Sequence, residues 1–239
     1  MDKRQHCPVA RAMDVLGDPW TLLLLRELLE GEFSLHTLQE RLRDLPAPAL
    51  NARVRKLEHH GLLAATSGES ADQRYRLTPR GVDARDVIDA FGVWGQRWLP
   101  APNLGDLDPR SLLEDICRDA DRSLLPVAPT TIQVDFLDAP HPARWWLTLS
   151  RAVAAASDTS PPREARVFVR TTRPTLAQVW LGDTSWQDAT ISGALASAGD
   201  SEIIGWLPTW IGTSRFAAVS KRGAALPTDQ TRSWRGRHG

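Results

Sequence analysis

The segment from residue 34 to residue 77 constrains the fold of this chain more than any other, because it orders two short helices and a ribbon around a proline-rich turn. Ser34 can cap the first helix, whose leucines recur at helical spacing. Pro46 and Pro48 then end that helix, because proline lacks the amide hydrogen that a continuing helix needs. The two helices are therefore expected to meet at a tight turn.

The second helix is expected from about Ala49 to His60, and Gly61 ends it. The stretches 62–66 and 74–77 flank a polar turn and predict a β-hairpin. This order is a helix-turn-helix followed by a wing, an arrangement whose second helix enters the major groove of DNA. The segment therefore predicts binding to double-stranded DNA.

Length and charge fit this interpretation. The 239 residues suffice for two domains, and the formal net charge is +0. Residues 41–60 nevertheless hold five Lys or Arg residues against two Asp or Glu residues, and such a local patch is enough to attract phosphates. No apolar run approaches the roughly 20 residues that span a bilayer, and two cysteines cannot build a disulfide framework. We therefore expect a cytoplasmic protein that does not contact a membrane.

Polar side chains on the two helices and the ribbon are the candidate DNA contacts. Asn51 and Arg55 lie one turn apart, and these residue types can read adenine and guanine edges in the major groove. A solvated polar helix face is the alternative. The residues expected to contact DNA are Ser34, Thr37, Asn51, Arg53, Arg55, Lys56, Arg74 and Arg76.

Other helices are expected on both sides of this segment. The helix from Pro19 to Leu29 is apolar nearly all round, so it should lie at the centre of the domain. The helix that starts at Thr78 carries an apolar stripe, which we expect to form a dimer interface, although it could instead cover the core of its own domain. The stripe consists of Val87, Phe91, Trp94 and Trp98.

The first hundred residues resemble the HxlR (DUF24) family of bacterial winged helix-turn-helix regulators. The resemblance lies in Cys7-Pro8-Val9, in Leu16 to Thr21, and in Leu50 to Glu58 with the residues that follow up to Gly81. It implies a winged helix domain over residues 1–98, a dimer, and the repression or activation of nearby genes. One departure is Pro46-Ala47-Pro48, where the family usually has a Ser-Pro-Arg-like step, so the operator sequence does not carry over.

The second half of the chain predicts an α+β domain with a small sheet. Strands are expected at 131–137, 143–150, 165–172 and 189–198, and helices at 111–125, 174–181 and 201–211. Short motifs such as Val134-Asp135-Phe136 make this half similar to the sterol-carrier-protein-2-like domain appended to some of these regulators. That resemblance implies a curved sheet with helices that enclose an apolar tunnel. The expected parts are a linker and helix at 99–126, this domain at 127–220, and a basic, disordered tail at 221–239.

Tryptophan is concentrated in the second domain. Trp145 and Trp146 are successive on a strand, so they face opposite sides of the sheet, and one side needs a helix, a partner subunit or a ligand as cover. Core packing explains most such residues, but aromatic walls are also typical of small-molecule pockets. We expect a hydrophobic or aromatic effector to contact Trp145, Trp146, Trp180, Trp206 and Trp210.

No motif for catalysis, metal or cofactor binding is present in the sequence, so we expect none of these functions. The sequence predicts a dimeric transcriptional regulator, most simply a repressor, whose affinity for operator DNA depends on an effector in the second domain. Two alternatives stay open. Cys7 could sense oxidants or electrophiles, because a helix N-terminus lowers a thiol pKa, or it could be unreactive. The chain could also be a lipid or small-molecule carrier that uses the winged helix for protein contacts.

Overall fold

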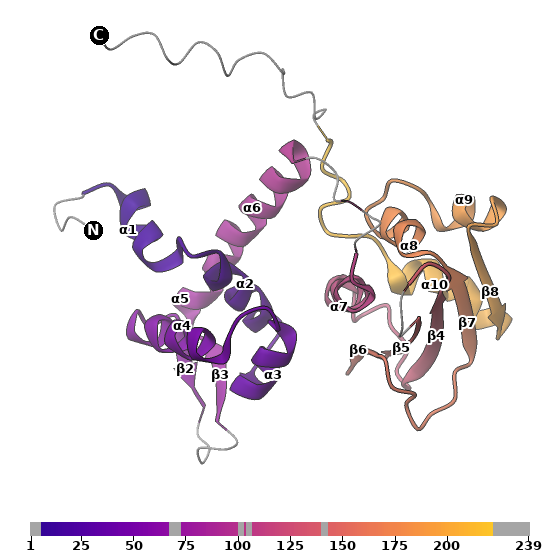
Figure 1. Cartoon of the computed structure of the whole chain (residues 1–239), viewed down its shortest axis with the longest axis horizontal. Helices are drawn as coiled ribbons and strands as arrows, with labels where there is room; N and C mark the ends of the chain where they lie inside the picture. Colours follow the sequence, from indigo (N-terminus) through magenta and orange to yellow (C-terminus); the bar gives the residue numbers. More distant parts are fainter. Residues whose placement is uncertain (1–5, 67–72, 100–102, 104–106, 140–142, 222–239) are drawn as a thin grey trace, which may run out of the picture. The chain divides into compact units, whose positions relative to one another are not determined.

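The structure is a computed structural model that describes residues 6–66, 73–99, 103, 107–139 and 143–221. The chain divides into two compact units, Met1–Gly92 and Val93–Gly239 (Figure 1). Each unit has an apolar core of its own. The expectations for the hairpin turn and for the tail beyond residue 221 lie outside the described residues.

The first unit packs helices around a small antiparallel sheet of order β1-β3-β2. Its strands are β1 (Phe33–Ser34), β2 (Leu63–Ala65) and β3 (Arg74–Leu77). Its helices are α1 (Pro8–Leu16), α2 (Pro19–Leu28), α3 (Leu35–Arg41), α4 (Ala47–His59), α5 (Pro79–Val82) and α6 (Ala84–Trp98), which runs past the unit boundary. The expected helix-turn-helix and hairpin are confirmed, with β1 as an additional strand.

Two local expectations for the first unit were wrong. Pro48 lies in the first turn of α4 rather than before it, since an amide in the first helical turn has no partner within the helix to lose. The helix expected from Thr78 is divided into α5 and α6 at Asp83. The central position of α2 is confirmed, because its Leu24 and Leu25 are fully buried.

A buried carboxylate joins α2 to α3. Glu27 is 1% exposed, and its two oxygens accept hydrogen bonds from Arg26 and Arg41, each at 3.1 Å. The Arg41 guanidinium also lies over the Phe33 ring, 4.4 Å from its centroid. Arg41 therefore belongs to the internal structure, although the sequence counts it within the basic patch.

The second unit is built on a five-stranded sheet of order β6-β5-β4-β7-β8, in which only the β4–β7 pair is parallel. The strands are β4 (Thr130–Phe136), β5 (Arg144–Leu149), β6 (Ala154–Ser157), β7 (Val167–Thr171) and β8 (Leu195–Gly199). The helices are α7 (Pro109–Asp119), α8 (Arg173–Trp180), α9 (Trp186–Ile191) and α10 (Ser201–Ile211). The α+β class is therefore confirmed.

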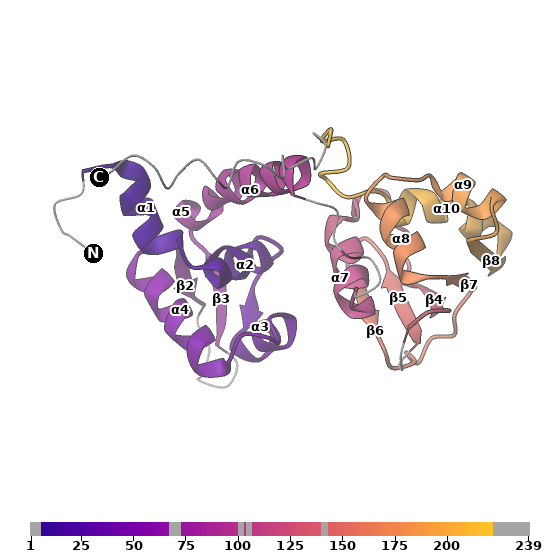
Figure 2. The ribbon, with the colours of Figure 1, turned by 45° about the horizontal axis from the view of Figure 1, so that its top comes forward.

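One face of this sheet is covered by helices and the other is not (Figure 2). Trp145, Leu147 and Leu149 are buried on β5, whereas the side chains between them are partly exposed. Leu113 of α7 and Leu207 of α10 are fully buried in the same core. The alternation along β5 therefore follows from helices that pack on one face only.

Three expectations for the second unit were wrong in detail. The strand expected at 189–198 is α9 followed by β8, and Gly193 with a φ of 75° separates them. The strand β6 was missed, because the stretch Ala154–Ser157 is rich in alanine, which is uncommon in strands. The first helix ends at Asp119 rather than near residue 125. No helix among the described residues is long and apolar enough to cross a membrane.

Candidate nucleic-acid interface

Helix α4 packs against the core along one side, and a cap at its C-terminus fixes how the chain leaves the helix. Leu50, Val54 and Leu57 follow helical spacing and are at most 1% exposed. Gly61 adopts a φ of 69°, and the amide of Leu62 donates to the Leu57 carbonyl at 2.9 Å. The outer side chains of α4 therefore have a defined direction relative to the hairpin that follows.

Two outer side chains of α4 have no hydrogen-bond or ion-pair partner among the described residues. Asn51 is half-buried and Arg55 is exposed, and they lie one turn apart on the same side. An amide and a guanidinium in this arrangement can each make paired hydrogen bonds to a base edge. The structure leaves both side chains open to an external partner.

Arg53, which the sequence groups with the DNA contacts, is instead bound within the protein. Its Nε and Nη2 donate to the two carboxylate oxygens of Asp18 at 2.7 and 2.6 Å, and its Nη1 donates to the Ala49 carbonyl at 3.0 Å. The hydrogen bond from Arg53 is the main cause that lowers the pKa of Asp18, and the same bond raises the pKa of Arg53. Its nitrogens thus have partners within the protein, and contact between Arg53 and DNA stays a prediction.

Three other expected contacts take part in helix junctions. Lys56 Nζ donates to the Asp14 carbonyl at 2.5 Å, although the side chain stays exposed. Ser34 Oγ accepts from the Thr37 amide at 3.2 Å and so caps α3, and the two hydroxyls lie 3.1 Å apart. Contact between these side chains and DNA stays a prediction.

The strand β3 carries the two arginines of the expected wing. Arg74 and Arg76 are exposed on either side of Tyr75, which is buried. Burial is the largest cause that raises the pKa of Tyr75, and the positive charge of Arg55 acts in the opposite direction. Because side chains alternate along a strand, the guanidinium groups of Arg74 and Arg76 lie on the face of β3 opposite the buried Tyr75 ring.

Sequence reasoning missed two interactions that hold the helix-turn-helix together. Gln39 Nε2 donates to the Leu45 carbonyl at 2.6 Å and so closes the turn between α3 and α4. Asp18 was expected only to cap α2, yet it also binds Arg53, 35 residues away. No local signal could have shown either interaction, because each depends on how the helices pack.

Comparison with known proteins places this region in a family. The profile of the HxlR-like helix-turn-helix family matches residues 15–103. An uncharacterized HTH-type transcriptional regulator of Synechocystis is 33% identical over 95 residues, which cover 39% of this chain and 70% of that protein. The chain belongs to the HxlR-like helix-turn-helix family.

Further matches concern the same part of this HxlR-like chain. An uncharacterized HTH-type transcriptional regulator of Mycobacterium tuberculosis is 38% identical over 96 residues, or 39% of this chain, and the chain spans 60% of its length. The solved structure of the reduced form of the transcriptional regulator YodB from B. subtilis is 20% identical, with a TM-score of 0.37, over 41% of this chain and 100% of that one. The family match ends at residue 103, so it assigns nothing to the sheet of the second unit.

The HxlR-like chain carries an exposed apolar stripe on α6. Its side chains are exposed to 37% at Val87, 59% at Phe91, 57% at Trp94 and 48% at Trp98. None of the four belongs to the core of the first unit. Contiguous exposed apolar side chains of this kind mark interaction surfaces.

Cys7 of this HxlR-like chain is exposed directly before α1, whereas Cys117 is buried. The backbone amides of Ala10 and Val9 lower the pKa of the Cys7 thiol. The thiolate is the reactive form of cysteine. Among the described residues, no three His, Cys, Asp or Glu side chains lie close enough together to hold a metal ion.

The tryptophans of the second unit do not converge on one site. Trp145 is 3% exposed in the core, and the Arg110 guanidinium lies 4.8 Å from its ring. Trp146 lies on the opposite, uncovered face of the sheet. Trp180 is half-buried, and its buried Nε1 has no hydrogen-bond partner among the described residues.

A groove of about 510 Å³ lies between α10 and the segment before β4. Trp206, Trp210 and Leu124 line its apolar part, and Trp206 is 49% exposed. Arg151 and Arg166 belong to the same lining. Glu202 lines it as well, and Arg166 is paired with Asp200, so the groove combines an apolar wall with charges of both signs.

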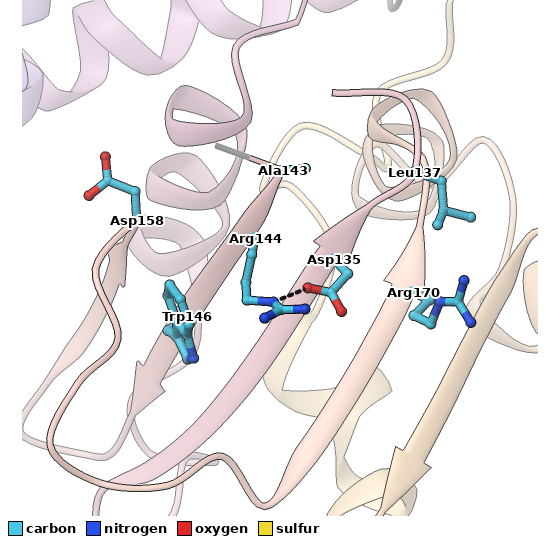
Figure 3. Close-up of a pocket in the computed structure, with 7 residues that line it drawn as sticks. All are labelled: Asp135, Leu137, Ala143, Arg144, Trp146, Asp158 and Arg170. Atoms are coloured by element: carbon cyan, nitrogen blue, oxygen red, sulfur yellow. Dashed lines mark hydrogen bonds and ion pairs between the residues drawn. The ribbon is translucent and has the colours of Figure 1, made fainter. Parts of the chain in front are cut away.

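A second groove, of about 740 Å³, lies on the uncovered face of the sheet (Figure 3). Trp146 lines it, and the neighbouring Arg144 donates from Nε to Asp135 at 2.8 Å. The Arg170 guanidinium points away from that pair. Of the expected effector residues, Trp206 and Trp210 line the groove beside α10 and Trp146 lines the second groove, whereas neither Trp145 nor Trp180 is in either lining.

Proposed function

We propose that this chain is a cytoplasmic transcriptional regulator that binds operator DNA as a dimer, most simply as a repressor. The observation that carries the proposal is that Asn51 and Arg55 project from α4 without internal partners, and that the hairpin after α4 exposes Arg74 and Arg76 on β3. A helix that reads bases and a hairpin that holds phosphates is the division of labour expected of a winged helix. Membership of the HxlR-like family supports the same function.

The decisive experiment measures binding to the duplex DNA that flanks the gene of this chain, across a salt series. We expect saturable binding, and the logarithm of its association constant should fall linearly with the logarithm of the salt concentration. Arg55→Ala should weaken it, whereas Arg163→Ala, which removes an equal charge from an exposed site in the second unit, should not. An absence of saturable, salt-dependent binding would contradict a regulator and would favour the carrier alternative.

The dimer part of the proposal rests on the α6 stripe. Four exposed apolar side chains on one helix are most simply covered by the same helix of a second copy, because a two-fold interface uses the same patch twice. The α4 helices of the two copies, acting as recognition helices, could then enter successive major grooves. Sedimentation of Phe91→Glu with Trp94→Glu should show a monomer, while Val153→Glu, an exposed apolar residue of the second unit, should stay dimeric.

For the second unit we propose a sterol-carrier-protein-2-like domain that binds a hydrophobic or aromatic effector. A sheet covered by helices on one face only, together with a tryptophan-lined groove beside α10, supports this assignment. An effector that prefers one spacing of the two recognition helices would change the DNA affinity by its differential binding. Native mass spectrometry of the purified protein should reveal a bound apolar molecule, lost in Trp206→Ala and kept in Trp146→Ala if the groove beside α10 is the site.

Cys7 supports a second route of regulation, because its thiol is exposed and its pKa is lowered by the amides at the start of α1. A thiol switch requires that Cys7→Ser abolish the response of DNA binding to oxidants and leave the binding itself intact. Cys117→Ser is the matched control, since that thiol is buried. An effector mechanism requires instead that both variants respond as the wild type does.

A further inference from the structure

The two arginines in the middle of α4 have opposite environments. They are two residues apart, and two residues turn a helix by about 200°, so Arg53 and Arg55 leave it on opposite sides. Arg55 is exposed, whereas the side chain of Arg53 is only 20% exposed and lies against Asp18. One helix thus directs one guanidinium outward and another toward the protein.

Asp18 uses one carboxylate for two purposes. Its Oδ1 accepts from the amides of Trp20 and Thr21 at 3.0 and 3.2 Å, which caps α2. Both of its oxygens also accept from Arg53, in the paired geometry that fixes a guanidinium most firmly. This pair therefore joins α4 to the start of α2, the central helix of the first unit.

A second contact lies on the same side of α4. Lys56 follows Arg53 by three residues, so the two share a side of the helix. Lys56 Nζ donates to the Asp14 carbonyl at 2.5 Å, near the end of α1. The corner between α1 and α2 therefore holds α4 along one side, while the opposite side carries Arg55.

We propose that Arg53 and Asp18 form a positioning pair that sets the rotation of α4 about its axis, and thereby the direction in which Asn51 and Arg55 meet the bases. The proposal rests on the function proposed above. Arg53 acts through Asp18 and does not touch DNA. Without the pair, α4 keeps its apolar contacts and the Lys56 hydrogen bond but loses the two parallel bonds that resist rotation about its axis. Base reading depends on side chains placed to within a fraction of an ångström, whereas attraction to phosphates tolerates such rotations.

The test is a double-mutant cycle on the full chain. Asp18→Asn keeps the cap, since asparagine caps helices as well as aspartate, but removes the charge that Arg53 binds. Arg53→Met keeps the apolar stem, and Arg53→Lys keeps the charge but cannot form two parallel bonds. The matched control is Arg55→Ala on the opposite side of the helix. Affinity is measured for the duplex that flanks the gene and for an unrelated duplex of equal length, across a salt series.

We expect Asp18→Asn, Arg53→Met and Arg53→Lys each to weaken binding to the flanking duplex about tenfold, the size of coupling effects carried through a protein. Binding to the unrelated duplex and the salt slope should not change. The double variant should be no weaker than the weaker single variant, because both remove one interaction. Arg55→Ala should lower the salt slope or the preference for the flanking duplex by direct loss of a contact.

A different pattern would overturn the positioning role. If Arg53→Met reduces the salt slope by about 0.9, while Arg53→Lys and Asp18→Asn bind as the wild type does, Arg53 contacts a phosphate directly. If the wild type itself shows no saturable, salt-dependent binding, the proposed function fails and the positioning role fails with it. Hydrogen exchange of α2 identifies variants that have lost the fold, and in a folded Arg53→Met protein faster exchange should be confined to α4.

Discussion

The inner side of α2 and the uncovered face of the second sheet both hold an arginine–carboxylate pair, in opposite settings. Glu27 on α2 is 1% exposed and binds two arginines from different elements. Asp135 on the sheet binds Arg144, whose side chain is 60% exposed. Removing one partner from a buried pair strands a charge away from water, whereas water replaces the partner of an exposed pair. The pairs of Glu27 should therefore contribute much more to the stability of the first unit than the Asp135–Arg144 pair contributes to that of the second.

The largest effect is expected at Glu27. Glu27→Ala should lower the free energy of unfolding of the first unit by about 3–5 kcal/mol, because it removes two charge-assisted hydrogen bonds to a buried carboxylate, each worth about 1.5–3 kcal/mol. Hydrogen exchange of peptides from α2 measures this unit alone. The control is Glu40→Ala, which removes the same charge from a side chain that is 61% exposed. If Glu27→Ala and Glu40→Ala lowered the free energy of unfolding equally, burial of the carboxylate would not determine the contribution of the pair.

In the second unit a loss of similar size is expected at an apolar residue of the sheet core. Leu147 is fully buried in the middle of the sheet core. Leu147→Ala should lower the free energy of unfolding of this unit by about 2–5 kcal/mol, through lost burial and the cavity left behind. Exchange of peptides from β4 and β5 reports the change. If Leu147→Ala lowered the free energy of unfolding less than removal of the exposed Arg144 side chain does, the stability of this unit would not have an apolar basis.

An intermediate and pH-dependent effect is expected at Asp18. Its pKa is lowered in the folded protein, chiefly by the hydrogen bond from Arg53, so its contribution to stability is present above the ordinary aspartate pKa. That contribution is lost as the pH falls through the lowered value. The stability difference between wild type and Asp18→Asn should therefore be constant above about pH 5 and shrink below about pH 4. Denaturation series at several pH values, monitored by hydrogen exchange of α2, measure this difference in the free energy of unfolding. A difference that did not change with pH would contradict a contribution from the pair.

The smallest effect is expected on the uncovered face of the sheet. Arg144→Ala should change the free energy of unfolding of the second unit by about 0–1 kcal/mol, because the pair with Asp135 is open to solvent. Urea denaturation in low and high salt checks this. A loss comparable to that of Glu27→Ala would show that the sheet depends on its surface charges and would end the contrast between the two units.

The parts of the fold that sequence could predict are those with local causes. Capping by Ser34 and Asp18, the end of α4 at Gly61 and the central place of α2 follow from neighbouring residues, and the structure confirms them. The partner of Arg53 could not be predicted, because it lies 35 residues away and depends on how α2 and α4 cross. Local patterns likewise gave no sign of β6. Its alanines pair with β5 because the fold places them beside it, although alanine has a low intrinsic preference for strands.

For the candidate site, residue type and spacing indicated which side chains lie on α4, but not which of them the protein itself binds. The side chains of Asn51 and Arg55 have no partner among the described residues, whereas Arg53, two residues from each, is bound by Asp18. Charge counted along the sequence therefore overstates the positive charge available to DNA. Arg41, bound to Glu27, reduces it further.

The position of β8 at the end of the second sheet has a consequence for synthesis of the chain. Because β7 lies between β4 and β8, the second sheet cannot be completed until Leu195–Gly199 has left the ribosome. The first unit needs nothing beyond α6, which is finished roughly 100 residues earlier, on the order of 5–20 s at ordinary rates of translation. A nascent chain can therefore hold a complete helix-turn-helix while the other half of the protein is still being made.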